Sequence, residues 1–190
     1  MLKELVLKNR SYRRFYQNEL IQKAQLRQWI DLARLGGSGR NAQSLRYMTV
    51  TDQGLCQHVF ENLAWAGYLS DWTGPVEGEK PVAYVIMLND ERLSKNYFCD
   101  DGIAVQNLLL GAVEDGFGGC ILRAFKEKKI RDLLNISDDY SIIQVVALGK
   151  PKEEVVLEEM KNNDIKYWRD EKGVHHVPKR KLEDLVINEF

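Results

Sequence analysis

The sequence predicts an α+β domain in which helices pack on a small β-sheet. Some segments repeat apolar residues with helical spacing, and a few continuous apolar runs have the length of a buried strand. The two kinds of segment alternate only loosely, and clear strands are few. A chain of 190 residues suits one compact domain, which at this size buries roughly 70% of its unfolded surface.

The first half of the chain predicts three helices and one strand. Residues 2–8 form a short amphipathic segment. Residues 23–35 place apolar side chains at i, i+3, i+4 and i+7 before two glycines end the helix. Residues 45–51 have the composition of a strand. Asp52 is placed to cap a third helix over residues 53–65, because its carboxylate can accept a hydrogen bond from a first-turn N–H group.

The second half of the chain predicts three strands and two helices. Residues 82–88 and 140–149 are apolar runs of strand length, which indicates buried strands, and residues 118–122 suggest a shorter one. Residues 103–113 are apolar on nearly every side, which is typical of a helix that is buried all round. Residues 126–134 carry many charges and predict a helix at the surface.

Composition excludes several classes of protein. Lys and Arg together number 27 and Asp and Glu 28, so the net charge is -1 and no general affinity for nucleic acid is expected. The three cysteines are an odd number without CxxC spacing, which predicts neither a disulfide framework nor a zinc site. No apolar run suits a signal peptide or a membrane span, so we expect a cytoplasmic protein that is not bound to a membrane.

The segment after residue 150 lacks the regular patterns of the preceding chain. About forty residues without a core period are unusual in a compact domain, so they are either disordered or ordered by something outside their own domain. Their scattered apolar residues favour docking on a partner subunit. We therefore divide the chain into a core over 1–150 and an extension over 151–190, within a single domain overall. The apolar residues expected to dock are Tyr167, Trp168, Val186, Ile187 and Phe190.

Four stretches contain residues that could bind a ligand. NRSYRRF (9–15) offers arginine forks that suit phosphate or carboxylate, and HHVPKRK (175–181) offers a second basic run. GGSGRNAQS (36–44) combines small residues with amide side chains, and EDGFGGC (114–120) makes a glycine-rich bend. Each also has a plainer interpretation as solvated charge, a polar loop or a helix end. Adjacent histidines without a carboxylate or cysteine at ligand spacing predict no metal site.

Taken in order, these stretches resemble the nitroreductase family of FMN-dependent oxidoreductases over nearly the whole chain. The matching segments are NRSYRRF, ARLGGSGRNAQSLRYMTV, DDGIAVQNLLLGAVEDGFGGCIL, VVALGKP and VPKRKLEDLV. The resemblance implies a small, mainly antiparallel central sheet flanked by helices. It also implies a homodimer with one FMN in each of two interface sites and a C-terminal tail that wraps the partner subunit.

The resemblance also assigns residues to the cofactor, although the loop and the arginine motif depart from the family pattern at Asn9, Gly37 and Ser44. Arg13 is the candidate cation that stabilises the reduced flavin ring, and Arg14 is expected to face solvent. Ser38, Asn41 and Gln43 are expected to reach the flavin of the partner subunit. The remaining predicted FMN contacts are Arg10, Ser11, Gly118, Gly119, Lys179 and Arg180.

The implied activity is an FMN-dependent NAD(P)H oxidoreductase. NADH or NADPH would reduce the flavin and leave, and an electron-poor acceptor such as a nitroaromatic or a quinone would then take its place. No side chain is obliged to act as nucleophile or base, so no catalytic residue is predicted. The alternatives are a flavin-binding carrier or sensor without turnover, and a protein that only mediates interactions. Trp65, Tyr68 and Trp72 border the irregular stretch 67–81 and form either a lid over the acceptor or part of the core.

Overall fold

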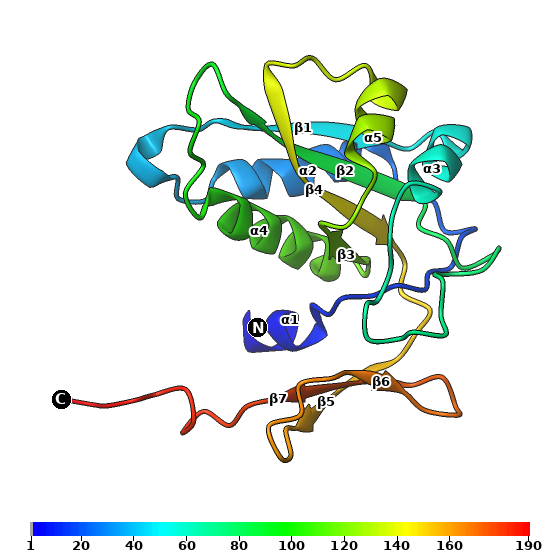
Figure 1. Cartoon of the computed structure of the whole chain (residues 1–190), viewed down its shortest axis with the longest axis vertical. Coiled ribbons are helices and arrows are strands. Elements are labelled where there is room, and N and C mark those ends of the chain that lie inside the picture. Colours follow the sequence, from blue (N-terminus) through cyan, green and yellow to red (C-terminus); the bar gives the residue numbers. More distant parts are fainter. Residues whose placement is uncertain (1) are drawn as a thin grey trace.

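A four-stranded antiparallel sheet forms the centre of the computed structural model, which describes residues 2–190 (Figure 1). Its strands are β1 (Leu45–Val50), β2 (Ala83–Asp90), β3 (Gly118–Leu122) and β4 (Tyr140–Gly149). They lie in the order β1-β2-β4-β3, and every neighbouring pair is antiparallel. The predicted α+β class and its small antiparallel sheet are therefore confirmed.

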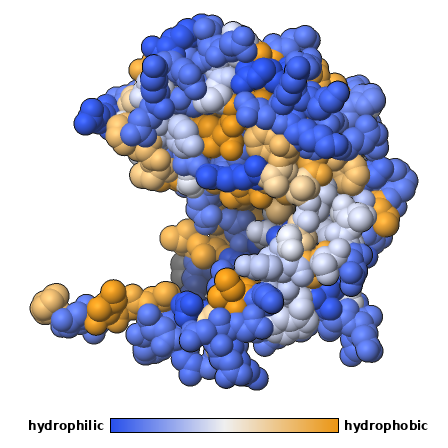
Figure 2. All heavy atoms as spheres, viewed as in Figure 1, coloured by the Kyte–Doolittle hydropathy of each residue, from blue (hydrophilic) through white to orange (hydrophobic). Residues whose placement is uncertain are grey.

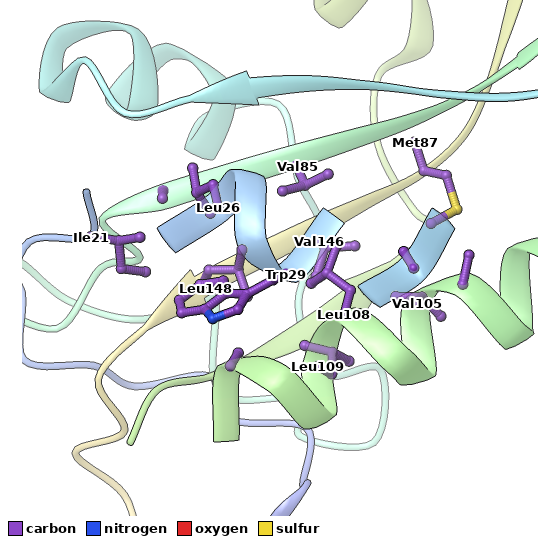
Figure 3. Packing of buried hydrophobic residues seen from close by; sticks show 14 of the residues in the cluster. Ile21, Leu26, Trp29, Val85, Met87, Val105, Leu108, Leu109, Val146 and Leu148 are labelled. Atoms are coloured by element: carbon purple, nitrogen blue, oxygen red, sulfur yellow. The ribbon is translucent and has the colours of Figure 1, made fainter. Parts of the chain in front are cut away.

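Helices cover both faces of this sheet. Helices α2 (Lys23–Arg34) and α4 (Asp100–Glu114) pack together on one face, where Trp29 and Leu108 lie at the centre of the core (Figure 3). Helices α3 (Gln53–Phe60) and α5 (Glu127–Leu134) cover the other face. The two remaining helical elements are α1 (Leu2–Lys8), which contacts α4, and the short 3-10 helix η1 (Gly39–Asn41).

The burial of strand β2 explains why residues 82–88 are a continuous apolar run in the sequence. All eight of its residues are buried. Val85 and Met87 face α2 and α4, whereas Tyr84 and Ile86 face α3 and α5, because successive side chains of a strand point to opposite faces. A strand that is covered on both faces needs apolar residues at every position rather than at alternate ones.

The third helix is shorter than its sequence predicts. The expected cap is present, because the Asp52 carboxylate accepts a hydrogen bond from the Leu55 N–H at 2.8 Å. The helix ends at Phe60, however, and not near residue 65. Leu63 pairs with Phe125 in an isolated bridge, so contacts with the chain that precedes α5 replace the last helical turn.

The extension after residue 150 forms strands that its sequence pattern does not predict. Strands β5 (Val155–Glu159), β6 (Trp168–Arg169) and β7 (His175–Lys179) form a second sheet in the order β5-β7-β6. These strands are short and mix polar with apolar residues, and apart from the buried His175 their residues are half-buried or exposed, so they lack the alternation that identifies a strand in sequence. The last residues run away from the body of the molecule as an extended arm (Figure 1), on which Ile187 and Phe190 are fully exposed.

The N-terminal segment that follows α1 runs between the main body and the second sheet (Figure 1). Arg14 does not face solvent as expected. Its guanidinium donates two hydrogen bonds, at 2.6 and 2.7 Å, to the carboxylate of Glu79, which also pairs with Lys152 at 3.0 Å. Arg14 is thus a structural residue that fastens this segment to the stretch 67–81.

The Glu79 carboxylate should make stability depend on pH. Hydrogen bonds from Arg14, and then from Lys152, lower the pKa of Glu79 from 4.5 to about 2. Its contribution is therefore complete above pH 4.5 and is lost as the pH falls toward 2. Glu79→Gln should cost roughly 1.5–3 kcal/mol at neutral pH, and this difference should shrink below the unfolded-state pKa. Urea unfolding of both proteins across this pH range measures the effect, and a difference that stays constant would contradict it.

None of the described helices is both long enough and apolar enough to span a membrane. Within residues 2–190, no three His, Cys, Asp or Glu side chains gather closely enough to hold a metal ion.

Candidate functional site

A cleft of about 260 Å³ lies between the N-terminal segment and strand β7. Three of its lining residues, Arg10, Arg13 and Lys179, are cations, and the lining contains no carboxylate. The structure therefore brings Arg10 and Arg13 of the N-terminal segment together with Lys179 of β7. The complete lining consists of Asn9, Arg10, Ser11, Arg13, Tyr167, His175, Val177 and Lys179.

Two glycines of β3 allow the N-terminal segment to approach the sheet. Ser11 forms a bridge with Gly119, and the Tyr12 N–H donates to the Gly119 carbonyl at 3.1 Å. A Cβ atom on Gly118 would lie 2.6 Å from the Tyr12 ring, which leaves no room for a side chain there. The space beside both glycines is thus occupied by other parts of the same chain, and Ser11 lies in the lining of the basic cleft. The predicted contact of Gly118 and Gly119 with a flavin ring stays a prediction.

The two arginines of the cleft keep donors that no acceptor uses. Arg13 is 9% exposed, and its Nη1 donates to the Ser11 carbonyl at 3.2 Å. The Arg10 Nη2 donates to the Val6 carbonyl at 2.6 Å. The Nε atoms of both side chains are buried without a hydrogen-bond partner, and neither arginine makes an ion pair within residues 2–190. Buried unpaired donors on cations are costly, so this arrangement suits an anionic ligand.

His175 and Tyr167 line the cleft, although the sequence assigned neither of them to the cofactor. His175 is 1% exposed, and its Nε2 lies 3.3 Å from Nη1 of Arg13. Burial, followed by the charges of Arg13 and Arg169, lowers the pKa of His175 to about 4, so the ring is neutral at neutral pH. The Tyr167 ring lies under the Arg13 guanidinium at 5.0 Å. Tyr167 therefore packs within its own chain, and its expected docking on a partner subunit stays a prediction.

The alternation along β7 decides which basic residues reach the cleft. His175, Val177 and Lys179 line it, as expected for residues on one face of a strand. Arg180 does not line it, and its Nη1 donates instead to the Asn163 side chain at 2.9 Å. The period of two in HHVPK could have identified His175 as a cleft residue, had this segment been predicted as a strand.

The predicted residues of the loop 36–44 lie in a separate cleft of about 360 Å³. Ser38, Asn41 and Gln43 all line it, and it shares no lining residue with the basic cleft. Asp100 fixes the loop, because its carboxylate accepts hydrogen bonds from the Ser38 hydroxyl at 2.6 Å and from the Gly39 N–H at 2.8 Å. One chain thus places the predicted residues in two separate clefts and does not bring all of them together.

The three aromatic residues expected either in a lid or in the core have different surroundings. Trp65 is buried in the core, and neither cleft is lined by any of the three. Tyr68 lies against Tyr167 with ring centroids 5.0 Å apart, and Trp72 lies under the Arg169 guanidinium at 4.7 Å. Trp65 is a core residue, whereas Tyr68 and Trp72 hold the stretch 67–81 against the C-terminal sheet, which is the second sheet formed by β5, β6 and β7.

Comparison with known proteins agrees with the fold. The model of the nitroreductase family matches residues 6–150. A putative NADH dehydrogenase/NAD(P)H nitroreductase from Archaeoglobus fulgidus is 26% identical over 149 residues, which cover 74% of this chain and 80% of the relative. Because the family match spans most of the sequence, the chain belongs to the nitroreductase family. That membership places it among the oxidoreductases.

Solved structures show the same fold at low sequence identity. A nitroreductase family protein from Streptococcus pneumoniae TIGR4 superimposes with a TM-score of 0.70 at 16% identity, over the full length of both chains. An FMN-dependent nitroreductase from Clostridium difficile R20291 gives a TM-score of 0.61 at 22% identity and covers 83% of this chain and 90% of its own. At these identities the similarity establishes the fold alone.

Proposed function

We propose that the protein is an FMN-dependent NAD(P)H oxidoreductase that passes electrons to an electron-poor acceptor such as a nitroaromatic or a quinone. The observation that carries this proposal is the cleft with three cations, no carboxylate and two buried Nε donors that lack acceptors. The names of a nitroreductase from Archaeoglobus fulgidus and an FMN-dependent one from Clostridium difficile support it. When bound, FMN would supply the hydride-transfer chemistry between NADH or NADPH and the acceptor.

The residues of the cleft fit a phosphate-bearing flavin. Arg10 and Lys179 are proposed to hold the phosphate, because guanidinium and ammonium groups donate charge-assisted hydrogen bonds to its oxygens. Ser11 is proposed to donate from its hydroxyl. Arg13 provides a fixed cation in a mostly buried setting, where it would favour the more negatively charged reduced flavin. Arg180 points to Asn163 and is not needed for this arrangement.

The second cleft supports a homodimer. Ser38, Asn41 and Gln43 lie outside the basic cleft of their own chain, so we propose that they complete the cleft of a partner subunit. The molecule is hollowed between its main body and the projecting arm, and apolar residues lie on both sides of the hollow (Figure 2). Apolar side chains on the arm, including Ile187 and Phe190, would be covered when a second copy fills this hollow.

Identification of the cofactor tests the proposed function. FMN should copurify or bind on addition, and mass analysis of the released flavin should show FMN and not FAD. Under anaerobic conditions NADH or NADPH should bleach the yellow colour, and a quinone or a nitro compound should restore it. A carrier or sensor would bind flavin without this cycle, and absence of any flavin affinity would exclude the proposed function.

Substitution of Arg13 should change the redox balance of bound flavin. Arg13→Gln keeps a hydrogen-bonding side chain but removes the charge, so the reduced flavin should lose more affinity than the oxidised form. The midpoint potential should fall by a few tens of millivolts, where about 30 mV corresponds to about 1.4 kcal/mol for a two-electron couple. Arg14→Gln is the matched control, because the charge of Arg14 is already compensated by Glu79. Redox titrations decide, and equal shifts in both variants would argue against a special role for Arg13.

A further inference from the structure

Arg13 and Arg14 are neighbours in the sequence, but Arg14 is held by a charged partner and Arg13 by neutral ones. Arg14 donates two hydrogen bonds to the Glu79 carboxylate, which compensates its charge. Within residues 2–190, the Arg13 guanidinium contacts neutral groups, namely the Ser11 carbonyl at 3.2 Å, His175 Nε2 at 3.3 Å, the Tyr167 ring at 5.0 Å and the thiol of Cys120, whose pKa is raised by burial. One arginine is therefore neutralised, and the other is fixed without being neutralised.

The buried carboxylate of Glu153 does not alter this contrast. It accepts a hydrogen bond from the backbone N–H of Arg13 and another from the Arg169 side chain at 2.9 Å. The contact with Arg169 is also an ion pair between its guanidinium and the Glu153 carboxylate. Glu153 therefore anchors the backbone of Arg13 and is paired with the side-chain charge of Arg169.

The hydrogen bond to Arg13 fixes the tautomer of His175. A guanidinium can only donate, so Nε2 of the imidazole must accept and cannot carry a proton. The proton of the neutral ring then lies on Nδ1, which is buried and has no hydrogen-bond partner among residues 2–190. A second proton would place a cation directly against Arg13.

The surroundings of His175 keep the imidazole neutral. Burial and two nearby arginines lower its pKa to about 4. The adjacent His176 has a raised pKa because it pairs with Glu158 and Asp170 on the other side of the strand. The groups whose charges act on His175 are Arg13 from the N-terminal segment, Arg169 from β6 and His176 from β7, and the Tyr167 ring lies 5.1 Å from the imidazole. Glu153 pairs with Arg169.

We propose that His175 is a positioning residue that holds the Arg13 guanidinium through a neutral acceptor and leaves its charge available to an anionic ligand of the cleft. This inference rests on the proposed function, because FMN is the ligand considered. A carboxylate at this position would hold Arg13 equally well but would neutralise it, as Glu79 does for Arg14. The neutral imidazole separates the two roles of fixing the side chain and compensating its charge.

Nitrogen NMR of the ¹⁵N-labelled full chain without added flavin tests the hydrogen-bonding arrangement. His175 should show a protonated Nδ1 and an unprotonated Nε2, unchanged between about pH 5 and pH 8. The His175→Gln spectrum assigns the resonances by the signals that it lacks. An Nε2-protonated ring, or a ring that titrates within this range, would overturn the proposal. The NMR result therefore depends neither on FMN binding nor on enzymatic activity.

Titration with oxidised and with reduced FMN tests the electrostatic role. His175→Gln retains a neutral acceptor and should bind both forms within about threefold of the unmodified chain. His175→Glu should lose at least about tenfold more affinity for reduced than for oxidised FMN, which is about 30 mV in midpoint potential. His176→Gln is the control on the same strand, because His176 does not line the cleft and should leave both affinities unchanged.

The outcomes separate this inference from the proposed function. If the unmodified chain binds no FMN, the proposed function fails, whereas the NMR result still decides the tautomer. If the unmodified chain binds FMN and His175→Glu preserves the ratio of the two affinities, the charge of Arg13 does not depend on a neutral partner and the inference is overturned. Circular dichroism and thermal melting confirm that each variant is folded before it is titrated.

Discussion

A chain that ends at Lys150 is expected to bind FMN at least about a hundredfold more weakly than the full chain, and to lose the proposed dimer. The truncation removes Lys179, which lines the basic cleft, together with His175 and Glu153, which hold Arg13. Loss of one or two charge-assisted hydrogen bonds, at roughly 1.5–3 kcal/mol each, accounts for this magnitude. Fluorescence titration of FMN and light scattering measure the two effects.

A second truncation separates the cleft from the proposed subunit contact. A chain that ends at Arg180 keeps the complete lining of the basic cleft but loses the arm that carries Ile187 and Phe190. It should remain folded and should dissociate more readily into monomers, because apolar surface that a partner would cover is gone. Ile187→Ser with Phe190→Ser in the full chain should act in the same direction. A flavin-loaded dimer from the chain ending at Lys150 would show that the extension is dispensable.

The central fold could be predicted from sequence because its burial pattern is local. Strand β2 is covered on both faces, so its residues 83–88 form an unbroken apolar run. The prediction that residues 103–113 are buried all round was wrong in part, because most of α4 is buried but Ile103 and Gln106 are exposed. The Asp52 cap was equally predictable, since the acceptor and the donor are three residues apart. The early end of α3 was not predictable, because it depends on a bridge from Leu63 to the distant Phe125.

The basic cleft was predictable only in part. Arginines near the N-terminus indicated an anion site, and the family resemblance joined them to the lysine of β7. The distinction between Arg13 and Arg14 required the partners Glu79 and His175, which lie far away in sequence. The sequence alone does not reveal such pairs, because each partner taken by itself looks like ordinary surface charge.

Removal of the proposed phosphate contacts should weaken FMN far more than riboflavin. Arg10→Ala and Lys179→Ala should each cost roughly 1.5–3 kcal/mol, or about tenfold to a hundredfold in affinity, because each removes a charge-assisted hydrogen bond. The double variant should lose more than either single variant. Riboflavin lacks the phosphate, so its weaker binding should change by less than about threefold in all three proteins. Fluorescence quenching measures both ligands under the same conditions.

Lys181→Ala provides the matched control for the lysine. Lys181 lies two residues further along the chain, does not line the cleft, and pairs with Glu159 at 2.9 Å. An exposed ion pair of this kind contributes little, so both FMN and riboflavin affinities should remain as in the unmodified chain. If Lys179→Ala weakened FMN and riboflavin equally, the lysine would be supporting the fold of the C-terminal sheet. The phosphate would then have to be held by Arg10 alone or at another place in the molecule.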